Sequence, residues 1–403
     1  MDLSLSAIKE VAEKLEGIIN HTQLYHSTTF SELTNNNIYM KAENFQKTGS
    51  FKIRGAYNKI SRLCDDERKC GVIAASAGNH AQGVALAASK NGISATIVMP
   101  KNAPMAKVTA TQNYGADVIL YGNIFDETYQ KALELQKQSE SIFIHPFNDL
   151  DIIAGQGTIA LEILEQLPET DIILAPIGGG GLISGIAIAA KAIKPDIEII
   201  GVEASNAASM KNSINKGFLT SLEQINTIAD GISIKTPGDI TFNICKEYLD
   251  DIITVTDEEI AGAILMLMER TKMVVEGAGA TVIAALLNKK LSKKDKTIVP
   301  VLSGGNIDFN IISRIIERGL IKTGRKSTIK TCIKDKPGSL SRLLSVVAVL
   351  DANIISINHD HYQPGVSIDD AEVELEIETR NKEHAEEVFK YLKDKGYFIK
   401  FLQ

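Results

Sequence analysis

Lys52 is the residue of this chain whose type and neighbours could carry covalent chemistry. It lies between Phe51 and Ile53, and an ammonium group in apolar surroundings tends to lose its proton because desolvation disfavours the charged form. A neutral lysine amine is a nucleophile toward aldehydes. Most single lysines are solvated surface charges, so this interpretation depends on partner motifs elsewhere in the chain.

Four consecutive glycines follow the apolar run 171–177 and precede a helical pattern that begins at Leu182. They are Gly178, Gly179, Gly180 and Gly181. Backbone N–H groups without side chains can converge on an anion, and the helix that follows adds its positive N-terminal end. The spacing G-x-G-x-x-G is absent, and Ile186 stands where a nucleotide-binding loop would carry lysine. We therefore expect the phosphate of a small cofactor here and no dinucleotide.

Two further turns follow apolar runs and could bind polar groups. The residues of the first turn are Ser76, Ala77, Gly78, Asn79 and His80. They open a helix, whose free N–H groups together with a hydroxyl suit a carboxylate. The second turn, 303–306, begins with Ser303 after the apolar run 297–302. A capped helix or a chain reversal would explain either turn alone, so only the combination of motifs indicates a site.

The elements that position these turns follow a repeated pattern. From about residue 70 to 320, short apolar runs alternate with helical patterns, as in 71–76, 79–92 and 94–100. Runs that are apolar throughout predict strands covered on both faces, and therefore a mostly parallel sheet with flanking helices. Function in such sheets lies at the carboxyl ends of the strands, which is where these turns occur.

The sequence changes character at a short polar link, 323–326. Beyond it the expected order is β-α-β-β-α-β, with strands over 328–334, 353–358 and 371–377 and a last strand at Tyr397. In the third of these strands apolar residues alternate with glutamates, which is typical of a strand with one face in water. We therefore expect a large α/β body joined to a small ferredoxin-like module.

The segment around Lys52, the first turn, the glycine run and the Ser303 turn occur in the order found in pyridoxal-phosphate enzymes of the tryptophan-synthase β type. Over about residues 5–320 the chain resembles the threonine dehydratases, also called threonine ammonia-lyases. The tail resembles an ACT regulatory domain, with the turn 335–340 after its first strand. The resemblance implies a fold type II α/β domain with two subdomains over 1–322 and a βαββαβ ACT domain over 327–403.

The resemblance also implies roles for the site residues. Lys52 would hold pyridoxal 5′-phosphate covalently, and Phe51 would pack beside its ring. The glycine run and the Leu182 N–H would bind the phosphate, Asn79 would hydrogen-bond the ring's 3′-oxygen, and the first turn would receive the substrate carboxylate. Ser303 would face the pyridine nitrogen. A hydroxyl there cannot stabilise a protonated pyridinium as a carboxylate would, which favours prompt loss of a β-substituent.

The implied activity is β-elimination of water from L-threonine to give 2-oxobutanoate and ammonia, with a side activity on L-serine that gives pyruvate. A serine-preferring dehydratase is an alternative, because one methyl group discriminates by only about 1–3 kcal/mol. Racemisation is disfavoured because Ala77 has no proton to give where serine racemases of this fold carry a serine. A catalytically silent amino-acid sensor is an alternative of another class.

Composition and charge limit the partners and the cellular compartment that the chain can have. The net charge is −7, and neither end is a basic arm, so no nucleic-acid partner is expected. Four cysteines without zinc spacing indicate a reducing compartment, and no apolar stretch reaches the roughly 18 residues of a membrane span. We expect a cytoplasmic homo-oligomer in which the ACT domain binds an amino-acid effector. No metal is predicted, because Glu203 is explained equally well as a structural acid and as a cation ligand.

Overall fold

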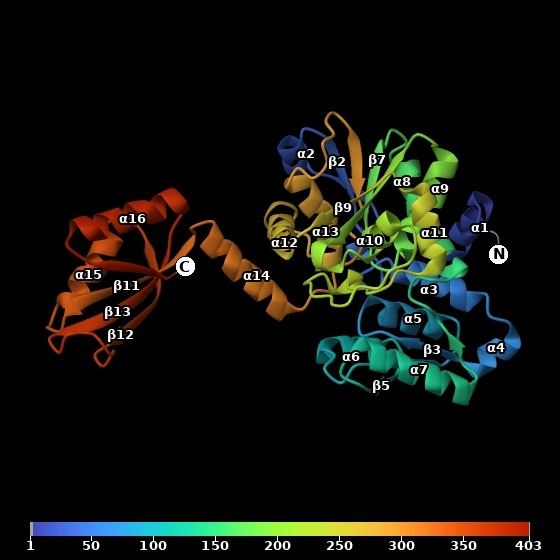
Figure 1. Cartoon of the computed structure of the whole chain (residues 1–403), viewed down its shortest axis with the longest axis horizontal. Helices are drawn as coiled ribbons and strands as arrows, with labels where there is room; N and C mark the ends of the chain where they lie inside the picture. The colour runs from blue at the N-terminus through green and yellow to red at the C-terminus, as the bar shows by residue number, and fades with distance from the viewer. Residues whose placement is uncertain (1–2, 403) are drawn as a thin grey trace. The chain divides into compact units, whose positions relative to one another are not determined.

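The computed structural model describes residues 3–402, with side chains described as far as residue 400. The chain folds into two compact units, residues 1–307 and 308–403. Figure 1 labels the helices and strands of both units.

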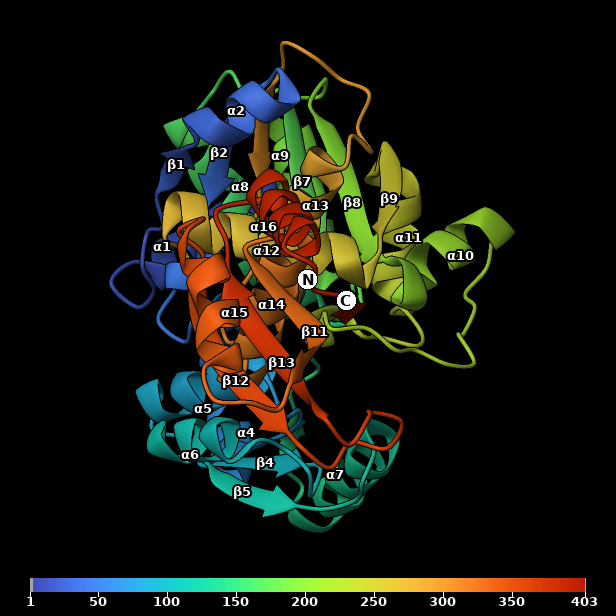
Figure 2. The same ribbon diagram turned by 90° about the vertical axis from the view of Figure 1, so that its left-hand side faces the viewer.

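The first unit contains two sheets, and Figures 1 and 2 both show the smaller sheet and helices α5–α7 as a layer apart from the larger sheet. The larger sheet has the order β1-β2-β10-β7-β8-β9, in which only β1 and β2 are antiparallel neighbours. The smaller sheet, β5-β4-β3-β6, is parallel. The strands are β1 Leu24–His26, β2 Asn37–Lys41, β7 Ile172–Pro176, β8 Glu198–Ala204, β9 Asp251–Val255 and β10 Thr297–Pro300 in the larger sheet, and β3 Val72–Ala75, β4 Ala95–Met99, β5 Asp117–Leu120 and β6 Ile142–Phe143 in the smaller.

Helices cover both sheets of the first unit. They are α1 Leu5–Leu15, α2 Thr28–Thr34, α3 Lys52–Ser61, α4 Asp65–Cys70, α5 Asn79–Lys90, α6 Met105–Asn113, α7 Phe125–Ser139, α8 Leu150–Gln166, α9 Gly181–Ile193, α10 Ser209–Lys216, α11 Asp239–Tyr248, α12 Asp257–Thr271 and α13 Gly277–Leu287, with single 3₁₀ turns η1 Glu43–Phe45, η2 Ser205–Ala207 and η3 Asp230–Ile232. Every residue of β3 and β7 is buried, as expected of strands covered on both faces. This confirms the expected α/β fold with two subdomains.

The second unit has one antiparallel sheet, in the order β12-β13-β11-β14, and three described helices. Its elements are α14 Phe309–Lys322, β11 Lys326–Lys334, α15 Ser339–Ala348, β12 Asn353–Asp360, β13 Asp370–Glu378, α16 Lys382–Asp394 and β14 Ile399–Leu402. Alternate residues of β13, among them Val373 and Leu375, pack into a core with α15 and α16. The opposite face carries charged pairs such as Lys330 with Glu372 and Glu374, at 3.0 Å each.

Helix α14 marks a difference from the expected boundary. The boundary expected from the sequence lies at residue 322, whereas the division into compact units falls between Ile307 and Asp308. The helix packs against β11, and the side chain of Asp308 caps its start by accepting from the Asn310 N–H at 2.8 Å. The expected order of strands and helices beyond residue 326 agrees with the structure.

Among residues 3–402, no helix is both long enough and apolar enough to cross a membrane.

Candidate active site

A cavity of about 1100 Å³ lies in the first unit, where β3, β7 and β10 end. It brings together every site residue that the sequence singled out, although they come from four separate parts of the chain. These residues are Phe51, Lys52, Ser76, Ala77, Gly78, Asn79, His80, Gly178, Gly179, Gly180, Gly181, Leu182 and Ser303. The roles assigned to them by resemblance remain predictions, but their placement in one cavity is a property of the fold.

Lys52 begins helix α3, and its amine is held inside the cavity. Its Nζ donates to the carbonyl oxygen of Pro146 at 2.8 Å and lies 5.3 Å from the centre of the Phe51 ring. Burial lowers the Lys52 pKa to about 8, and the negative charge of Glu276 opposes this shift. A larger fraction of this amine is therefore neutral near neutral pH than for a surface lysine.

The glycine run makes the turn between β7 and α9 and leaves no room for side chains. Gly180 has φ +94°, and a Cβ on Gly179 would lie 2.2 Å from the Phe147 ring. The Thr241 hydroxyl donates to the Gly179 carbonyl oxygen at 2.5 Å and fixes the turn. The first N–H groups of a helix have no acceptor within it, so α9 presents free donors at this point. The run therefore forms a cradle of the kind that binds a phosphate.

The first turn joins β3 to α5, and its side chains have different environments. The Ser76 hydroxyl accepts from the Gly78 N–H at 3.2 Å. His80 is buried, and its Nε2 donates to the Ile144 carbonyl oxygen at 2.8 Å. Burial and the charge of Lys52 lower the His80 pKa to about 3, so the ring is neutral. His80 can therefore serve an anion through its backbone N–H, whereas its side chain is engaged elsewhere.

The Asn79 side chain is fixed by two neighbours. Its Nδ2 donates to both carboxylate oxygens of Glu276, at 2.7 and 2.9 Å. Asn306 Nδ2 donates to Asn79 Oδ1 at 2.8 Å and to the Thr48 carbonyl oxygen at 2.7 Å. The expected bond from Asn79 to the cofactor's 3′-oxygen remains a prediction, because its amide hydrogens face Glu276 in this structure.

Glu276, the acid directly before helix α13, was not predicted as a site residue from the sequence. It is 3% exposed and lines the cavity together with Ser303. Burial first, and the charge of Asp230 second, raise the Glu276 pKa to about 7. In the sequence, Glu276 is a single acid between an apolar residue and a glycine-rich apolar helix. That pattern is not specific enough to assign it a role in the site.

Two further groups of the cavity were not expected. Lys107 Nζ, from α6, lies 2.8 Å from Asp230 Oδ2 of η3, so an ion pair joins the two subdomains at the cavity. His145 also lines the cavity, and burial together with the Lys52 charge lowers the His145 pKa to about 4. Lys107 and Asp230 come from segments without a recognisable motif, and His145, which precedes Pro146 in a segment that ends a strand, was explained from the sequence by packing alone.

Glu203 lies outside this cavity and caps helix α10. Its carboxylate oxygens accept from the Met210 and Lys211 N–H groups at 2.9 Å each, and burial raises the Glu203 pKa to about 7. Within residues 3–402, no three or more His, Cys, Asp or Glu side chains are grouped closely enough to hold a metal ion.

A lysine amine inside a cavity, a glycine run and a helix-opening turn at the carboxyl ends of parallel strands are the features expected of an enzyme that uses a phosphorylated aldehyde cofactor. Residues 15–304 match the family described as pyridoxal-phosphate dependent enzyme, and the chain belongs to this family. It is 52% identical over 400 residues to an L-threonine ammonia-lyase of Thermotoga maritima, a match that covers 99% of this chain and 100% of the relative.

Solved structures agree with this assignment. A threonine deaminase isoform of Solanum lycopersicum has a TM-score of 0.75 at 39% identity, covering 77% of this chain and 87% of its own. A maize serine racemase has a TM-score of 0.75 at 37% identity, covering 80% of this chain and 99% of its own. The cavity fits the cofactor of the family, because the glycine run lines it with backbone alone and the Lys52 amine lies in the same cavity. Packing against Phe147 leaves no space for a side chain at Gly179 or Gly181, so the N–H groups of this turn stay uncovered by side chains of the run.

Proposed function

We propose that this chain is an L-threonine ammonia-lyase, which converts L-threonine to 2-oxobutanoate and ammonia. The observation that carries the proposal is the meeting, in one cavity, of the Lys52 amine, the glycine cradle and the first turn. The high identity to a full-length relative named L-threonine ammonia-lyase supports the choice of substrate.

Pyridoxal phosphate, when bound, supplies an acceptor for the electrons that remain at Cα after proton loss. Lys52 would hold it covalently, with Phe51 packed beside the ring and the N–H groups from the glycine run to Leu182 on the phosphate. Ser303 would face the ring nitrogen, and Asn79 the 3′-oxygen.

The first turn would bind the substrate carboxylate and thereby orient the Cα–H bond. The Lys52 amine, released by the incoming substrate, would then take the Cα proton as a general base. A lowered pKa suits this role, because the amine must be neutral to accept a proton. The Lys107–Asp230 ion pair lies at the same cavity and joins the two subdomains there.

The direct test supplies the purified holoenzyme with L-threonine and with L-serine and measures kcat/KM for each. We expect 2-oxobutanoate from L-threonine with the higher kcat/KM, and pyruvate from L-serine. A higher kcat/KM for L-serine would make this a serine-preferring dehydratase, since one methyl group changes binding by only about 1–3 kcal/mol.

A racemase is the second candidate, because a serine racemase has a similar structure. Ala77 argues against it, since a methyl side chain in the first turn cannot exchange a proton with the substrate. Incubation with L-serine should leave no D-serine that chiral chromatography detects, and appreciable D-serine would overturn this assignment.

A catalytically silent amino-acid sensor is the alternative of another class. Reduction of the holoenzyme with borohydride should fix the cofactor's mass on Lys52, as read by peptide mass spectrometry. A protein that neither binds the cofactor at Lys52 nor forms a 2-oxo acid would support the sensor instead.

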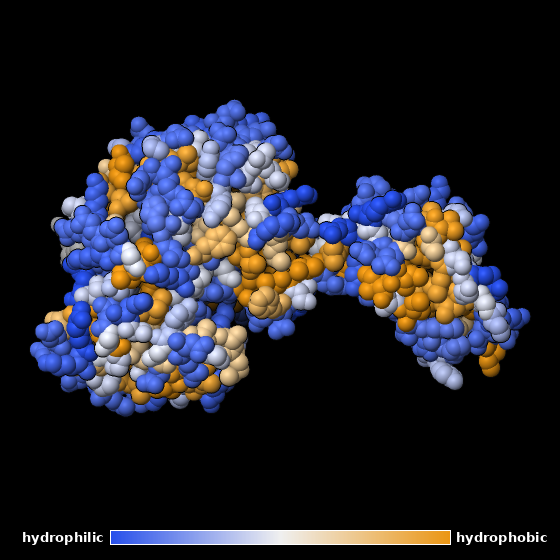
Figure 3. All heavy atoms as spheres, turned by 180° about the vertical axis from the view of Figure 1, so that it is seen from behind, coloured by the Kyte–Doolittle hydropathy of each residue, from blue (hydrophilic) through white to orange (hydrophobic). Residues whose placement is uncertain are grey.

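For the domains, we propose that residues 1–322 are catalytic and that residues 327–403 are an ACT domain that binds an amino-acid effector. Strand β12 forms a free edge of its sheet, with Ile355 49% and Ile357 41% exposed, and Val349 nearby in sequence is 66% exposed. Figure 3 shows apolar surface on this unit. An exposed apolar edge favours pairing with a second copy, which supports a homo-oligomer.

Deletion of residues 327–403 tests whether catalysis and effector binding belong to separate domains. It should leave turnover of L-threonine near that of the full chain and abolish the response to isoleucine or valine. A truncated enzyme that still responds would place the effector site in the catalytic domain.

The free thiols of Cys64, Cys70, Cys245 and Cys332 suit a reducing compartment, and we place the protein in the cytoplasm.

A further inference from the structure

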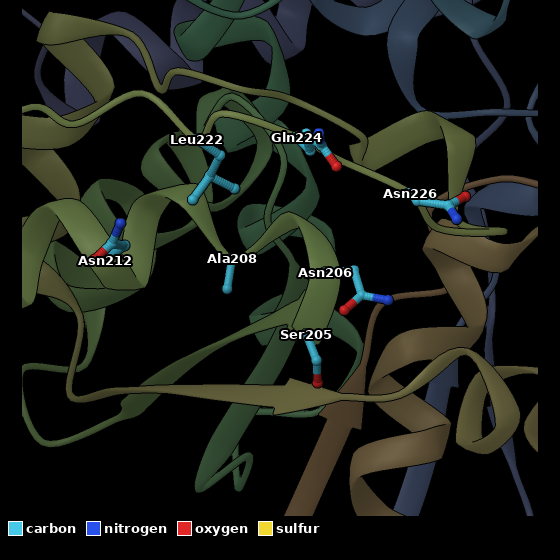
Figure 4. A pocket seen from close by; sticks show the side chains of 7 residues that line it. All are labelled: Ser205, Asn206, Ala208, Asn212, Leu222, Gln224 and Asn226. Carbon is cyan, nitrogen blue, oxygen red and sulfur yellow. The ribbon is translucent and has the colours of Figure 1, made fainter.

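A second cavity, of about 500 Å³, lies in the first unit just beyond the carboxyl end of β8. It is lined by Ser205, Asn206, Ala208, Asn212, Leu222, Gln224 and Asn226. Four of these seven side chains are carboxamides and none is charged, so we name it the carboxamide cavity. Figure 4 shows three of the carboxamides grouped on one side, Asn212 on the other, and Leu222 between them in this view.

Three of the four carboxamides, Asn206, Gln224 and Asn226, are exposed, and Asn212 is partly buried. Within residues 3–402, none of their side chains hydrogen-bonds to another protein group. Each carboxamide offers two N–H donors and an acceptor oxygen, and a partner with a donor next to an acceptor can bind it through two hydrogen bonds, as an adenine edge does. The volume is within the range of small-molecule sites, and the lack of charged lining residues favours an uncharged ligand.

One wall of the carboxamide cavity also forms a wall of the catalytic cavity. This wall is the segment 217–238 between α10 and α11. Gln224 and Asn226 line the carboxamide cavity, whereas Ile225 between them lines the catalytic cavity. The Leu222 N–H donates to the Lys235 carbonyl oxygen at 3.0 Å, and this bond joins a residue of the carboxamide cavity to a residue of the catalytic cavity.

The same segment contacts the glycine cradle. A Cβ on Gly178 would lie 2.8 Å from Cα of Ile232, and the Gly238 N–H donates to the Gly179 carbonyl oxygen at 3.5 Å. A ligand that bridges Asn212 on α10 and Gln224 on the segment would therefore restrict the chain that packs against the cofactor's phosphate turn.

We propose that the carboxamide cavity binds a small uncharged effector that carries a hydrogen-bond donor next to an acceptor, as a primary amide or a purine base does. Its binding changes the affinity of the catalytic cavity for the amino-acid substrate through the segment 217–238. This second statement rests on the proposed function, whereas the binding site itself does not.

The test titrates the full-length holoenzyme by calorimetry with two uncharged probes, nicotinamide and adenosine, and with 3-acetylpyridine, which lacks the amide N–H. We expect at least one of the two probes to bind, and 3-acetylpyridine to bind at least about tenfold more weakly. Binding of nicotinamide alone would assign the site to amides, and binding of adenosine alone would assign it to nucleosides.

Two nearly isosteric variants, Asn212→Leu and Gln224→Met, remove the hydrogen-bonding groups from opposite walls. Each should raise the Kd of the probe at least about tenfold. The matched control is Glu223→Gln, since Glu223 is exposed and lines neither cavity, and it should keep the wild-type Kd. Failure of both probes to bind, or an unchanged Kd in both variants, overturns the site.

The effect of probe binding on the affinity for L-threonine is measured with the same holoenzyme. A saturating probe should change the KM for L-threonine by about fivefold or more, and Asn212→Leu should abolish that change. An unchanged KM with the probe bound overturns the coupling. A protein that binds the probe but does not turn over L-threonine would contradict the proposed function and leave the site established.

Discussion

The two units of this protein differ in how deeply their paired charged side chains are buried. In the first unit, Arg54 and Lys41 are fully buried and share hydrogen bonds with Glu43 and Glu162. In the second unit, Lys330 and its glutamate partners lie on an open sheet face. Buried charges must be paired because an unpaired one has no water to solvate it, whereas exposed pairs contribute little.

This difference matters for function because Arg54 and Lys52 belong to the same helix, α3. The ion cluster joins that helix to β2 and α8 and so fixes where the Lys52 amine lies. The sheet of the second unit does not have to fix the position of a reactive group, because no residue with a predicted catalytic role lies in it. We therefore expect substitutions in the first unit to have large effects and charge substitutions in the second to have small ones.

The largest effect is expected from Lys52→Ala. Loss of the amine removes both the covalent attachment and the general base, so kcat for 2-oxobutanoate formation should fall by at least about 10³-fold. Lys59→Ala, on the same helix, is the control and should keep its turnover, because Lys59 only pairs with Asp149 and Asp151. Retained activity in Lys52→Ala would contradict the proposed mechanism.

Arg54→Met tests how much a buried charge of the first unit contributes to stability, compared with an exposed charge of the second. It leaves Glu43 and part of Glu162 buried without their guanidinium partner, and we expect the free energy of unfolding to fall by about 3–5 kcal/mol. Urea denaturation followed by circular dichroism measures this change. Lys330→Met on the open sheet should leave the free energy of unfolding nearly unchanged, and equal losses in both variants would remove the distinction drawn here.

Gly179→Ala tests the phosphate cradle. The added Cβ would lie 2.2 Å from the Phe147 ring, and such overpacking costs about 1–3 kcal/mol. We expect the Kd of pyridoxal phosphate for the apoenzyme, measured by equilibrium dialysis, to rise by about tenfold or more. Gly262→Ala in α12 is the matched control, because a Cβ there meets nothing within 4 Å. An unchanged Kd in Gly179→Ala would show that the phosphate binds elsewhere.

The smallest effect is a shift in pH dependence. Below its pKa of about 8 the Lys52 amine is protonated and cannot attack an aldehyde, so the rate at which apoenzyme takes up pyridoxal phosphate should rise through about pH 8 and then level off. Glu276→Gln removes the negative charge that raises this pKa, so the midpoint should move to lower pH. A midpoint near 10.5 in the wild type would mean that the amine is solvated.

The residues of the sequence motifs were predictable because each motif is local. The glycine run and the first turn directly follow apolar strands, and the carboxyl ends of parallel strands meet at one edge of a sheet. The expected boundary at residue 322 placed α14 with the first domain, whereas the helix belongs to the second unit, because that membership depends on packing against β11. A helical pattern gives the buried face of a helix and not the partner that covers it.

The sequence by itself determined the fold class, the candidate lysine and the turns predicted to bind two anions, since these follow from the apolar pattern and from the combination of local motifs. Only the tertiary structure decided that Glu276 faces Asn79, 197 residues away, that Lys107 pairs with Asp230, and that carboxamides from two segments face one cavity. The physical reason is that such contacts depend on how distant strands are ordered in a sheet, and no local pattern specifies that order.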